Sequence, residues 1–266
     1  MLKQLIATAA ALMVSTGVAQ ARQSDEIAML KVGDPAPKLT NVTWVQGEPV
    51  SDYQSGQVYV LDFWATWCGP CKASIPHMND LHKKHQKDGV NVIGLAIWPR
   101  PNMVPTAEFV KEKGDDMGYR IAEDVDGKSA EMFMKATGQN GIPTVMVVDK
   151  AGKLAWIGYP MGPDAEEMDA TINRLIANTF DLSAATSKYE VKLKKEKKVN
   201  DARRQLTKAL NAKNFDEALF MMDSMLAEHP EDLAMLAVLK YQILLVEKND
   251  PASAGNWGRQ AIAGVI

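Results

Sequence analysis

The sequence predicts an α/β domain with a mixed central sheet, followed by an all-helical region. Four apolar runs rich in β-forming residues lie between residues 58 and 158, and helical segments separate the first three of them. A short turn joins the last two runs into a hairpin. Beyond Asp181 such runs disappear and charged, helical sequence replaces them. At 266 residues the chain is long enough for two domains, which we place at 22–180 and 181–266.

The individual elements follow from these patterns. The four runs predict strands over 58–63, 90–97, 144–149 and 154–158, and a shorter strand candidate covers 119–122. Helical spacing of apolar residues predicts helices over 71–87, 106–113, 129–137 and 165–178, with Asp164 as the cap of the last. Residues 31–43 read as an extended lead-in. Strands that alternate with helices and close in a hairpin predict a three-layer sandwich around the sheet.

The helical region contains a weak internal repeat. Residues 213–218 are echoed by residues 248–254, at an offset of about 35 residues, which is near the tetratricopeptide period. Residues 188–205 form a charged helix whose basic run is most simply a solvated face. Pro230 should end a helix between the two similar segments. The alternative is a pair of ordinary helical hairpins whose sequences agree by chance.

The N-terminus has the pattern of a secretory signal peptide over residues 1–21. Lys3 supplies the positive charge, an apolar run follows from Leu5 to about Val18, and Ala19-Gln20-Ala21 resembles a cleavage site. We therefore expect a periplasmic or secreted protein, cut near Ala21, with an uncleaved signal anchor as the alternative. The formal net charge of −3 argues against a nucleic-acid partner.

Cys68 and Cys71 are the two cysteines of the chain. A bridge between them would close a very small ring, for which loop entropy gives only about 2 kcal/mol, so a purely passive bridge would stabilise little. The spacing therefore favours chemistry. One alternative is half of a zinc site completed by His77, His82 or His85. We expect no metal and no cofactor beyond the redox-active pair itself.

A strand that leads Cys68 into the first turn of a helix suits a reactive thiolate. Unpaired N–H groups and the positive end of the helix dipole stabilise the anion and lower the thiol pKa. Cys68 should therefore attack, and Cys71, one turn further along, should resolve the mixed disulfide. Pro70 falls where a helix tolerates proline.

These residues resemble the active site of the thioredoxin superfamily. The segment Trp67-Cys68-Gly69-Pro70-Cys71-Lys72 matches that site, Asp62 lies where the family has a buried acid, and Gly141-Ile142-Pro143-Thr144 resembles its cis-proline loop. Residues 32–37 and the helical insertion between Ile97 and Gly141 resemble the exported TlpA/ResA-like branch. The resemblance covers residues 31–178 and omits the helical region.

The resemblance implies a thiol-disulfide oxidoreductase with a thioredoxin-like fold. It implies catalytic roles for Cys68, Cys71, Asp62 and Pro143, and substrate contacts from Trp67, Gly69, Pro70 and Ile142. The expected partners are protein disulfide or dithiol substrates, an upstream electron donor and a possible protein partner at 181–266. Gly69-Pro70 favours the reducing direction, although the sequence does not fix the direction of electron flow.

Two other functions remain open. In the first, the helical region docks a partner and the thioredoxin-like domain serves as a scaffold. In the second, the chain is a peroxiredoxin-like peroxide reductase, because a similar lead-in occurs in such chains. A peroxide reductase would need its peroxidatic cysteine in a different local motif.

Overall fold

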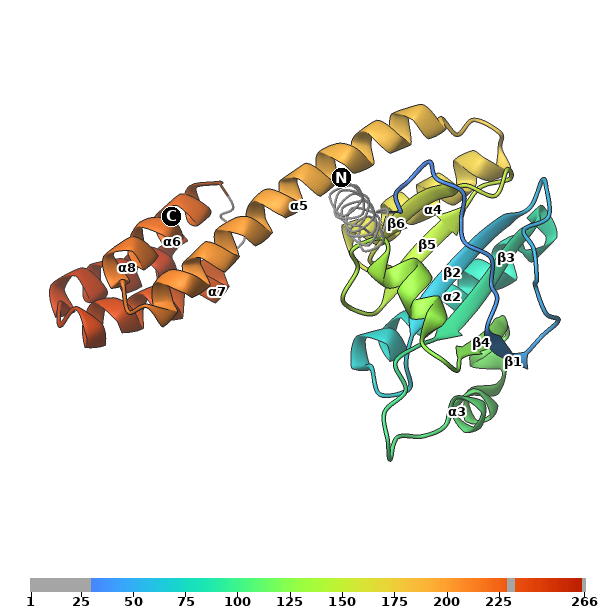
Figure 1. The fold of residues 1–266 in the computed structure, drawn as a ribbon, viewed down its shortest axis with the longest axis horizontal. Helices are drawn as coiled ribbons and strands as arrows, with labels where there is room; N and C mark the ends of the chain where they lie inside the picture. The colour runs from blue at the N-terminus through green and yellow to red at the C-terminus, as the bar shows by residue number, and fades with distance from the viewer. Residues whose placement is uncertain (1–29, 229–232, 265–266) are drawn as a thin grey trace, which may run out of the picture. The chain divides into compact units, whose positions relative to one another are not determined.

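The computed structural model describes residues 30–228 and 233–264 (Figure 1). The predicted signal peptide and Pro230 lie outside these residues. The chain divides between Ser187 and Lys188 into two compact units. The division falls within a long helix that begins at Leu182. The domain boundary predicted after residue 180 stays a prediction.

The N-terminal unit is built on a six-stranded sheet flanked by helices (Figure 1). Its strands are β1 (Val42–Gln46), β2 (Val58–Trp64), β3 (Val90–Ala96), β4 (Arg120–Asp124), β5 (Thr144–Val148) and β6 (Leu154–Gly158). Its helices are α2 (Gly69–His85), α3 (Thr106–Lys113) and α4 (Pro163–Ile176), with shorter helical turns η1 (Gln86–Asp88), η2 (Gly114–Met117) and η3 (Ala130–Lys135).

The strand order is β1-β4-β3-β2-β5-β6. Strands β2, β3 and β4 run parallel, whereas the β1–β4, β2–β5 and β5–β6 pairs are antiparallel. The central strand β2 is buried at every residue, which explains why its sequence is a continuous apolar run with one acid. The predicted mixed sheet is confirmed, and the fold is thioredoxin-like.

Side chains of β2 alternate between the two faces of the sheet. Val58, Val60 and Trp64 pack in one core cluster with apolar residues of α2 and α4. On the other face, the Phe63 ring lies 5.4 Å from the ring of Phe133 in η3. Both faces of the sheet are therefore covered, and the three-layer prediction is confirmed.

Three local expectations differ from the structure. Residues 42–46 form the edge strand β1, whereas the sequence suggested an extended lead-in over residues 31–43 and no strand at this place. Residues 130–135 form a π-helix rather than an α-helix. The cap of α4 is Gly162 rather than Asp164, because the helix already begins at Pro163. Asp164 instead accepts the backbone N–H of Tyr159 at 3.3 Å.

The C-terminal unit is helical, as expected. It contains most of α5 (Leu182–Asn211), followed by α6 (Phe215–Glu228), α7 (Leu233–Gln242), the π-helical turn η5 (Ile243–Glu247) and α8 (Pro251–Ala263). Its core lies between these helices and includes Leu206, Ala218, Met222, Leu236, Ile243 and Trp257. Within the described ranges, no helix combines the length and apolar character that crossing a membrane requires.

The two helical hairpins of this unit begin their second helices in the same way. Lys213 and Asn249 both adopt a positive φ, of 55° and 48°. The next residue in each case, Asn214 or Asp250, accepts a backbone N–H three positions further on. The internal repeat in the sequence aligns Lys213 with Lys248, whereas the two turns align Lys213 with the next residue, Asn249. The structural equivalent of Lys213 is Asn249.

Candidate redox-active site

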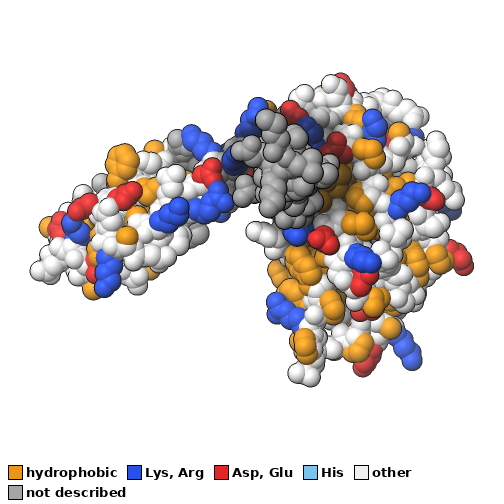
Figure 2. Space-filling model, in the orientation of Figure 1, with side chains coloured by type: hydrophobic (Ala, Val, Ile, Leu, Met, Phe, Trp, Pro, Cys, Tyr) orange, Lys and Arg blue, Asp and Glu red, His pale blue; other side chains and the backbone are white. Residues whose placement is uncertain are grey.

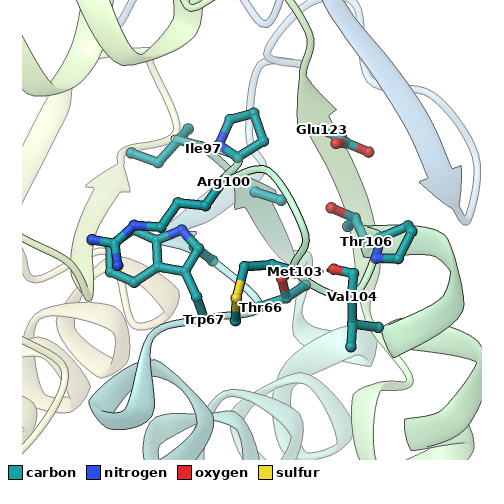
Figure 3. Close-up of a pocket in the computed structure, with 12 residues that line it drawn as sticks. Thr66, Trp67, Ile97, Arg100, Met103, Val104, Thr106 and Glu123 are labelled. Atoms are coloured by element: carbon teal, nitrogen blue, oxygen red, sulfur yellow. Dashed lines mark hydrogen bonds between the residues drawn. The ribbon is translucent and has the colours of Figure 1, made fainter.

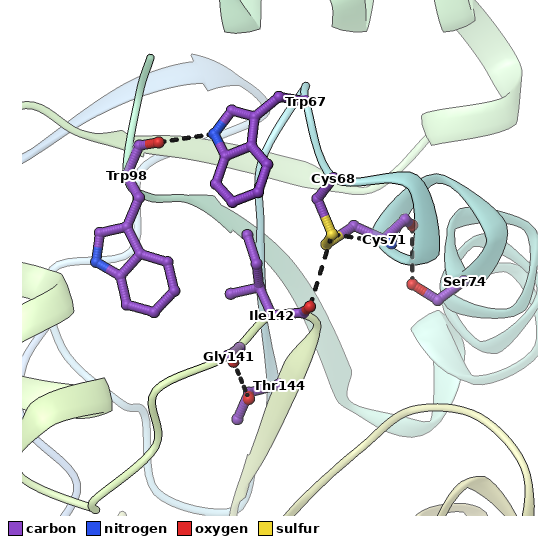
Figure 4. Close-up of a disulfide and its surroundings, with 8 residues drawn as sticks. All are labelled: Trp67, Cys68, Cys71, Ser74, Trp98, Gly141, Ile142 and Thr144. Atoms are coloured by element: carbon purple, nitrogen blue, oxygen red, sulfur yellow. Dashed lines mark hydrogen bonds between the residues drawn. A yellow bond between two sulfur atoms is a disulfide. The ribbon is translucent and has the colours of Figure 1, made fainter. Parts of the chain in front are cut away.

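A disulfide joins Cys68 and Cys71 at the start of α2, with an S–S distance of 2.03 Å (Figure 4). Cys68 is the N-cap residue, and its Sγ accepts the backbone N–H of Cys71 at 3.2 Å. Cys68 is 4% exposed and Cys71 is fully buried, while Gly69 and Pro70 between them are exposed. Of the two cysteines, Cys68 is thus the one nearer to the surface.

The loop before β5 faces the disulfide. The Ile142–Pro143 peptide bond is cis, and the Ile142 carbonyl oxygen lies 3.7 Å from Cys68 Sγ. A reduced Cys68 thiol has a proton to donate to that oxygen. Thr144 holds the loop in place, because its Oγ1 donates to the Gly141 carbonyl at 2.8 Å (Figure 4). The sequence had assigned no role to Thr144.

Trp67 is half-buried beside Cys68 and is held from two sides. Its indole Nε1 donates to the Trp98 carbonyl at 2.8 Å, and the guanidinium carbon of Arg100 lies 3.4 Å from the centre of its ring. Figure 4 shows the first contact and Figure 3 the second. Trp98 adopts a φ of 53°, which is uncommon for a bulky residue. The loop after β3 therefore supports the residue that directly precedes Cys68.

Ser74 lies one turn beyond Cys71 and is buried. Its Oγ donates to the Cys71 carbonyl at 2.9 Å (Figure 4). This bond fixes the Ser74 hydroxyl within the first turns of α2, beneath the cysteines. The sequence suggested no function for it, since a serine inside a helix commonly bonds back to the preceding turn.

Asp62 lies on the face of β2 that packs against α2, and it is 1% exposed. Neither of its carboxylate oxygens has a hydrogen-bond partner among the described residues, and the same holds for Trp64 Nε1 and the Tyr119 hydroxyl. Burial raises the pKa of Asp62 to about 7. Burial, and secondarily the charge of Asp62, raises the pKa of Tyr119 well above its usual value.

The three histidines of α2 do not assemble with the cysteines. His77 Nε2 lies 3.4 Å from Asp169 Oδ1, and His85 Nδ1 lies 2.9 Å from Asp88 Oδ2. The His82 ring lies 6.5 Å from the Tyr119 ring. Burial lowers the pKa of His82, and the nearby positive charges of Arg120 and Lys83 lower it further. Within residues 30–228 and 233–264, no group of three or more His, Cys, Asp or Glu side chains could hold a metal.

Topology and site together define a thioredoxin-like domain with a redox-active disulfide. The family model described as AhpC/TSA family matches residues 32–157. The thiol-disulfide oxidoreductase ResA of Bacillus thuringiensis subsp. konkukian is 32% identical over 127 residues, which cover 47% of this chain and 68% of ResA. The chain belongs to the family of thioredoxin-like thiol-disulfide oxidoreductases that includes ResA.

One further relative and one solved structure are also similar to this chain. Protein FixW of Rhizobium leguminosarum is 31% identical over 137 residues. That match covers 48% of this chain and 61% of FixW, so the chain spans less than two thirds of FixW. A solved structure described as a putative thiol:disulfide interchange protein DsbE from Chlorobium tepidum is 28% identical. The match covers 55% of this chain and 99% of the chain in that structure, with a TM-score of 0.44.

Proposed function

We propose that the protein is an exported protein-disulfide reductase in which Cys68 attacks and Cys71 resolves. One observation carries this assignment. Cys68 caps α2 with its sulfur against the Cys71 N–H, so a Cys68 thiolate would keep this bond and gain the favourable helix dipole. The deeper position of Cys71 suits a residue that attacks only the Cys68 sulfur, once Cys68 has formed a mixed disulfide with the substrate.

The reaction has two exchange steps. The Cys68 thiolate attacks one sulfur of a substrate disulfide, which forms a mixed disulfide and releases the other substrate sulfur as a thiolate. Cys71, once deprotonated, attacks the Cys68 sulfur, which closes the Cys68–Cys71 disulfide and releases the second substrate thiolate. The substrate gains two electrons and the protein loses them. An upstream dithiol donor must then reduce the pair again.

Asp62 is the proposed acceptor of the Cys71 proton. Its position on the sheet face beneath α2 and its pKa of about 7 suit a base that works near neutral pH. Pro143, with Ile142, Trp67, Gly69 and Pro70, would form the surface that holds the substrate next to Cys68. The exposed Gly69 and Pro70 and the Ile142 carbonyl beside the sulfur support this placement.

Insulin reduction tests the activity. With dithiothreitol as the electron donor, the full chain should accelerate insulin precipitation, and Cys68→Ser should not. The reduction potential of the pair tests the direction, because thioredoxin lies at about −270 mV and DsbA at about −120 mV. We expect a value nearer to thioredoxin. Absence of catalysis by the wild-type chain would contradict the reductase assignment.

Export is tested independently of activity. We propose that residues 1–21 direct the chain out of the cytoplasm and are removed near Ala21. Expression of the full sequence in a bacterial host, followed by fractionation and N-terminal sequencing, should give a periplasmic protein that starts near Arg22. A cytoplasmic product that retains Met1 or Leu2 would contradict export.

A partner-docking role for the helical unit is the second candidate. A cavity of about 230 Å³ lies between α5 and α6, and its lining includes Met221, Met225 and the highly exposed Phe220. Apolar side chains also reach the surface elsewhere in the chain (Figure 2). We propose that these tetratricopeptide-like hairpins bind a protein partner. If the thioredoxin-like domain were only a scaffold, partner capture would depend on Phe220 and insulin reduction would be absent.

Peroxide reduction is a third candidate, favoured by the family model that matches residues 32–157. If the chain is a protein-disulfide reductase and not a peroxide reductase, the reduced wild-type chain should consume hydrogen peroxide no faster than Cys68→Ser does. A rate that is high and depends on Cys68 would instead favour a peroxide reductase over a protein-disulfide reductase.

A further inference from the structure

Beside the redox-active disulfide lies a small pocket to which the proposed function assigns no role. Its volume is about 70 Å³, enough for one small side chain. One wall is the segment from Ala65 to Trp67, and the other is the loop that follows β3, from Ile97 to Thr106 (Figure 3). The pocket therefore borders the residue that directly precedes Cys68.

The loop is fixed to the segment before Cys68 at three points. The Ile97 N–H donates to the Trp64 carbonyl at 2.9 Å, and the Trp98 carbonyl accepts the indole N–H of Trp67. At the far end, Thr66 Oγ1 donates to the Val104 carbonyl at 2.8 Å. A wall held in this way is preformed, which lowers the cost of ordering it around a ligand.

Arg100 stands at the edge of this pocket with its binding atoms available. The flat face of its guanidinium stacks on the Trp67 ring. The N–H donors lie in the plane of the guanidinium and point away from the ring. Arg100 is exposed and makes no ion pair with any residue in the described ranges. This geometry leaves a planar fork of donors that matches a carboxylate.

The side of the pocket opposite Arg100 carries a negatively charged residue. Figure 3 shows Glu123 across the pocket from Arg100. A ligand carboxylate would be attracted at the Arg100 side and repelled at the Glu123 side. Met103 and Val104, which also line the pocket, are each 42% exposed and present apolar surface. The arrangement therefore favours one orientation of a bound segment.

We propose that Arg100 and this pocket form a specificity site for the polypeptide that carries the substrate disulfide. The occupant is an extended segment with an acidic side chain within two residues of its reactive cysteine and a small apolar side chain next to it. The acidic group binds the outward donors of Arg100, and the apolar group enters the pocket beside Met103. This inference rests on the proposed reductase function and names its substrate class.

Peptides of defined sequence test the proposal. Each carries one cysteine as a mixed disulfide with thionitrobenzoate, whose release is coloured, and has Asp, Asn or Lys placed two residues before or after the cysteine. With the reduced full chain in a single turnover, the second-order rate constant of thionitrobenzoate release should be roughly tenfold higher for the better Asp peptide than for its Asn counterpart. The Lys peptide should be slowest. The preference should weaken in 0.5 M salt.

Three variants separate charge from apolar contact. Arg100→Gln should remove the Asp preference, so that the Asp and Asn peptides release thionitrobenzoate at equal rates. Arg100→Lys should restore the preference only in part, because it keeps the charge and loses the stacked fork. Met103→Ser should slow the Asp and Asn peptides alike. Arg174→Gln is the matched control, since this exposed arginine bonds within α4 to the Ala170 carbonyl.

The outcomes are distinguishable. Equal rates for the Asp and Asn peptides with the wild-type chain, or an Asp preference that survives in Arg100→Gln, would overturn the specificity site while leaving the reductase function standing. If the wild-type chain released thionitrobenzoate from none of the peptides, the reductase function would fail and the specificity site with it. A preference lost equally in Arg174→Gln would show an effect of net charge and overturn the role of Arg100.

Discussion

Asp62 on β2 lies directly opposite Gly94 on β3 in the parallel register of the sheet. A Cβ atom at Gly94 would lie 2.8 Å from Ile121 Cδ1, 3.1 Å from Trp64 Nε1 and 3.1 Å from Tyr119 Cε2. The missing side chain therefore makes room for two aromatic groups next to the buried carboxylate. They exclude water from Asp62, and this desolvation is what raises its pKa.

Gly94→Ala should destabilise the N-terminal unit by about 1–3 kcal/mol, because the new methyl group overpacks against Ile121 and the two aromatic rings. Urea unfolding measures the change. Gly118→Ala is the control, since its nearest neighbour would be Asn79 Oδ1 at an ordinary 3.4 Å. If both variants lost the same stability, the close packing at Gly94 would not be the cause.

Asp62→Asn should stabilise the oxidised protein above neutral pH. The pKa of Asp62 is raised from 3.8 to about 7 on folding. Between these values the native state holds a proton that the unfolded state has lost, so wild-type stability falls as pH rises and then levels off above about 7. Asparagine does not ionise and escapes this penalty, which is on the order of a few kcal/mol.

The stability gain of Asp62→Asn should therefore vanish near pH 4 and be largest at pH 8, as measured by urea unfolding at several pH values. Asp124→Asn provides the comparison. Asp124 is also buried, but its oxygens accept the N–H groups of Ser129 and Ala130. Its replacement should destabilise the protein. A gain for Asp62→Asn that does not change with pH would contradict the proposed ionisation.

The same substitution should slow only the second exchange step. In the proposed mechanism, formation of the mixed disulfide uses Cys68, whose sulfur already has the Cys71 N–H and the helix terminus beside it. Resolution needs the Cys71 proton to be accepted. Rapid-quench trapping should thus show an unchanged first step and a second step slowed roughly tenfold or more. If both steps slowed equally, Asp62 would have a structural role only.

The two cysteines should behave differently when replaced singly. Cys71→Ser should accumulate mixed disulfides with exported proteins, because Cys68 can still attack while nothing releases it. Cys68→Ser should trap nothing, since Cys71 is fully buried. Mass spectrometry of non-reduced complexes measures this. Equal trapping by the two variants would be incompatible with the proposed division of roles.

Trp257→Ala should destabilise the helical unit by about 3–5 kcal/mol or unfold it. Trp257 is buried in that unit's core, and its Nε1 donates to the Ala237 carbonyl at 2.9 Å. Circular dichroism should show the loss of helix, while insulin reduction should continue, because the cysteines lie in the other unit. Phe220→Ala is the control, since its side chain is 72% exposed.

The central strands could be predicted because burial on both faces requires continuous apolar sequence. Residues 58–63 and 144–149 carry that signal, and β2 and β5 fall within one residue of the predicted ranges. The edge strand β1 was missed because it is only half-buried and pairs with β4, far away in the chain. Local sequence carries little information about such a pairing.

The cysteine pair and the loop before β5 could be predicted because their residues match a known pattern. The contacts of Arg100 could not. Arg100 contacts Trp67, whose indole N–H donates to the carbonyl of Trp98, and Trp98 has a positive φ that no sequence rule assigns to tryptophan. Likewise, Asp62 could be placed in a buried strand, but the neighbouring Tyr119 follows from the register of β3 and β4.

The connections at Lys213 and Asn249 have the same backbone geometry, so the residues of one connection can replace those of the other. Both connections solve one geometric problem, a left-handed residue followed by a capping residue, with different side chains. Asparagine adopts this backbone conformation more readily than lysine does. Grafting Asn249-Asp250 onto positions 213–214 would therefore preserve the turn and leave Phe215 packed against the core of the unit.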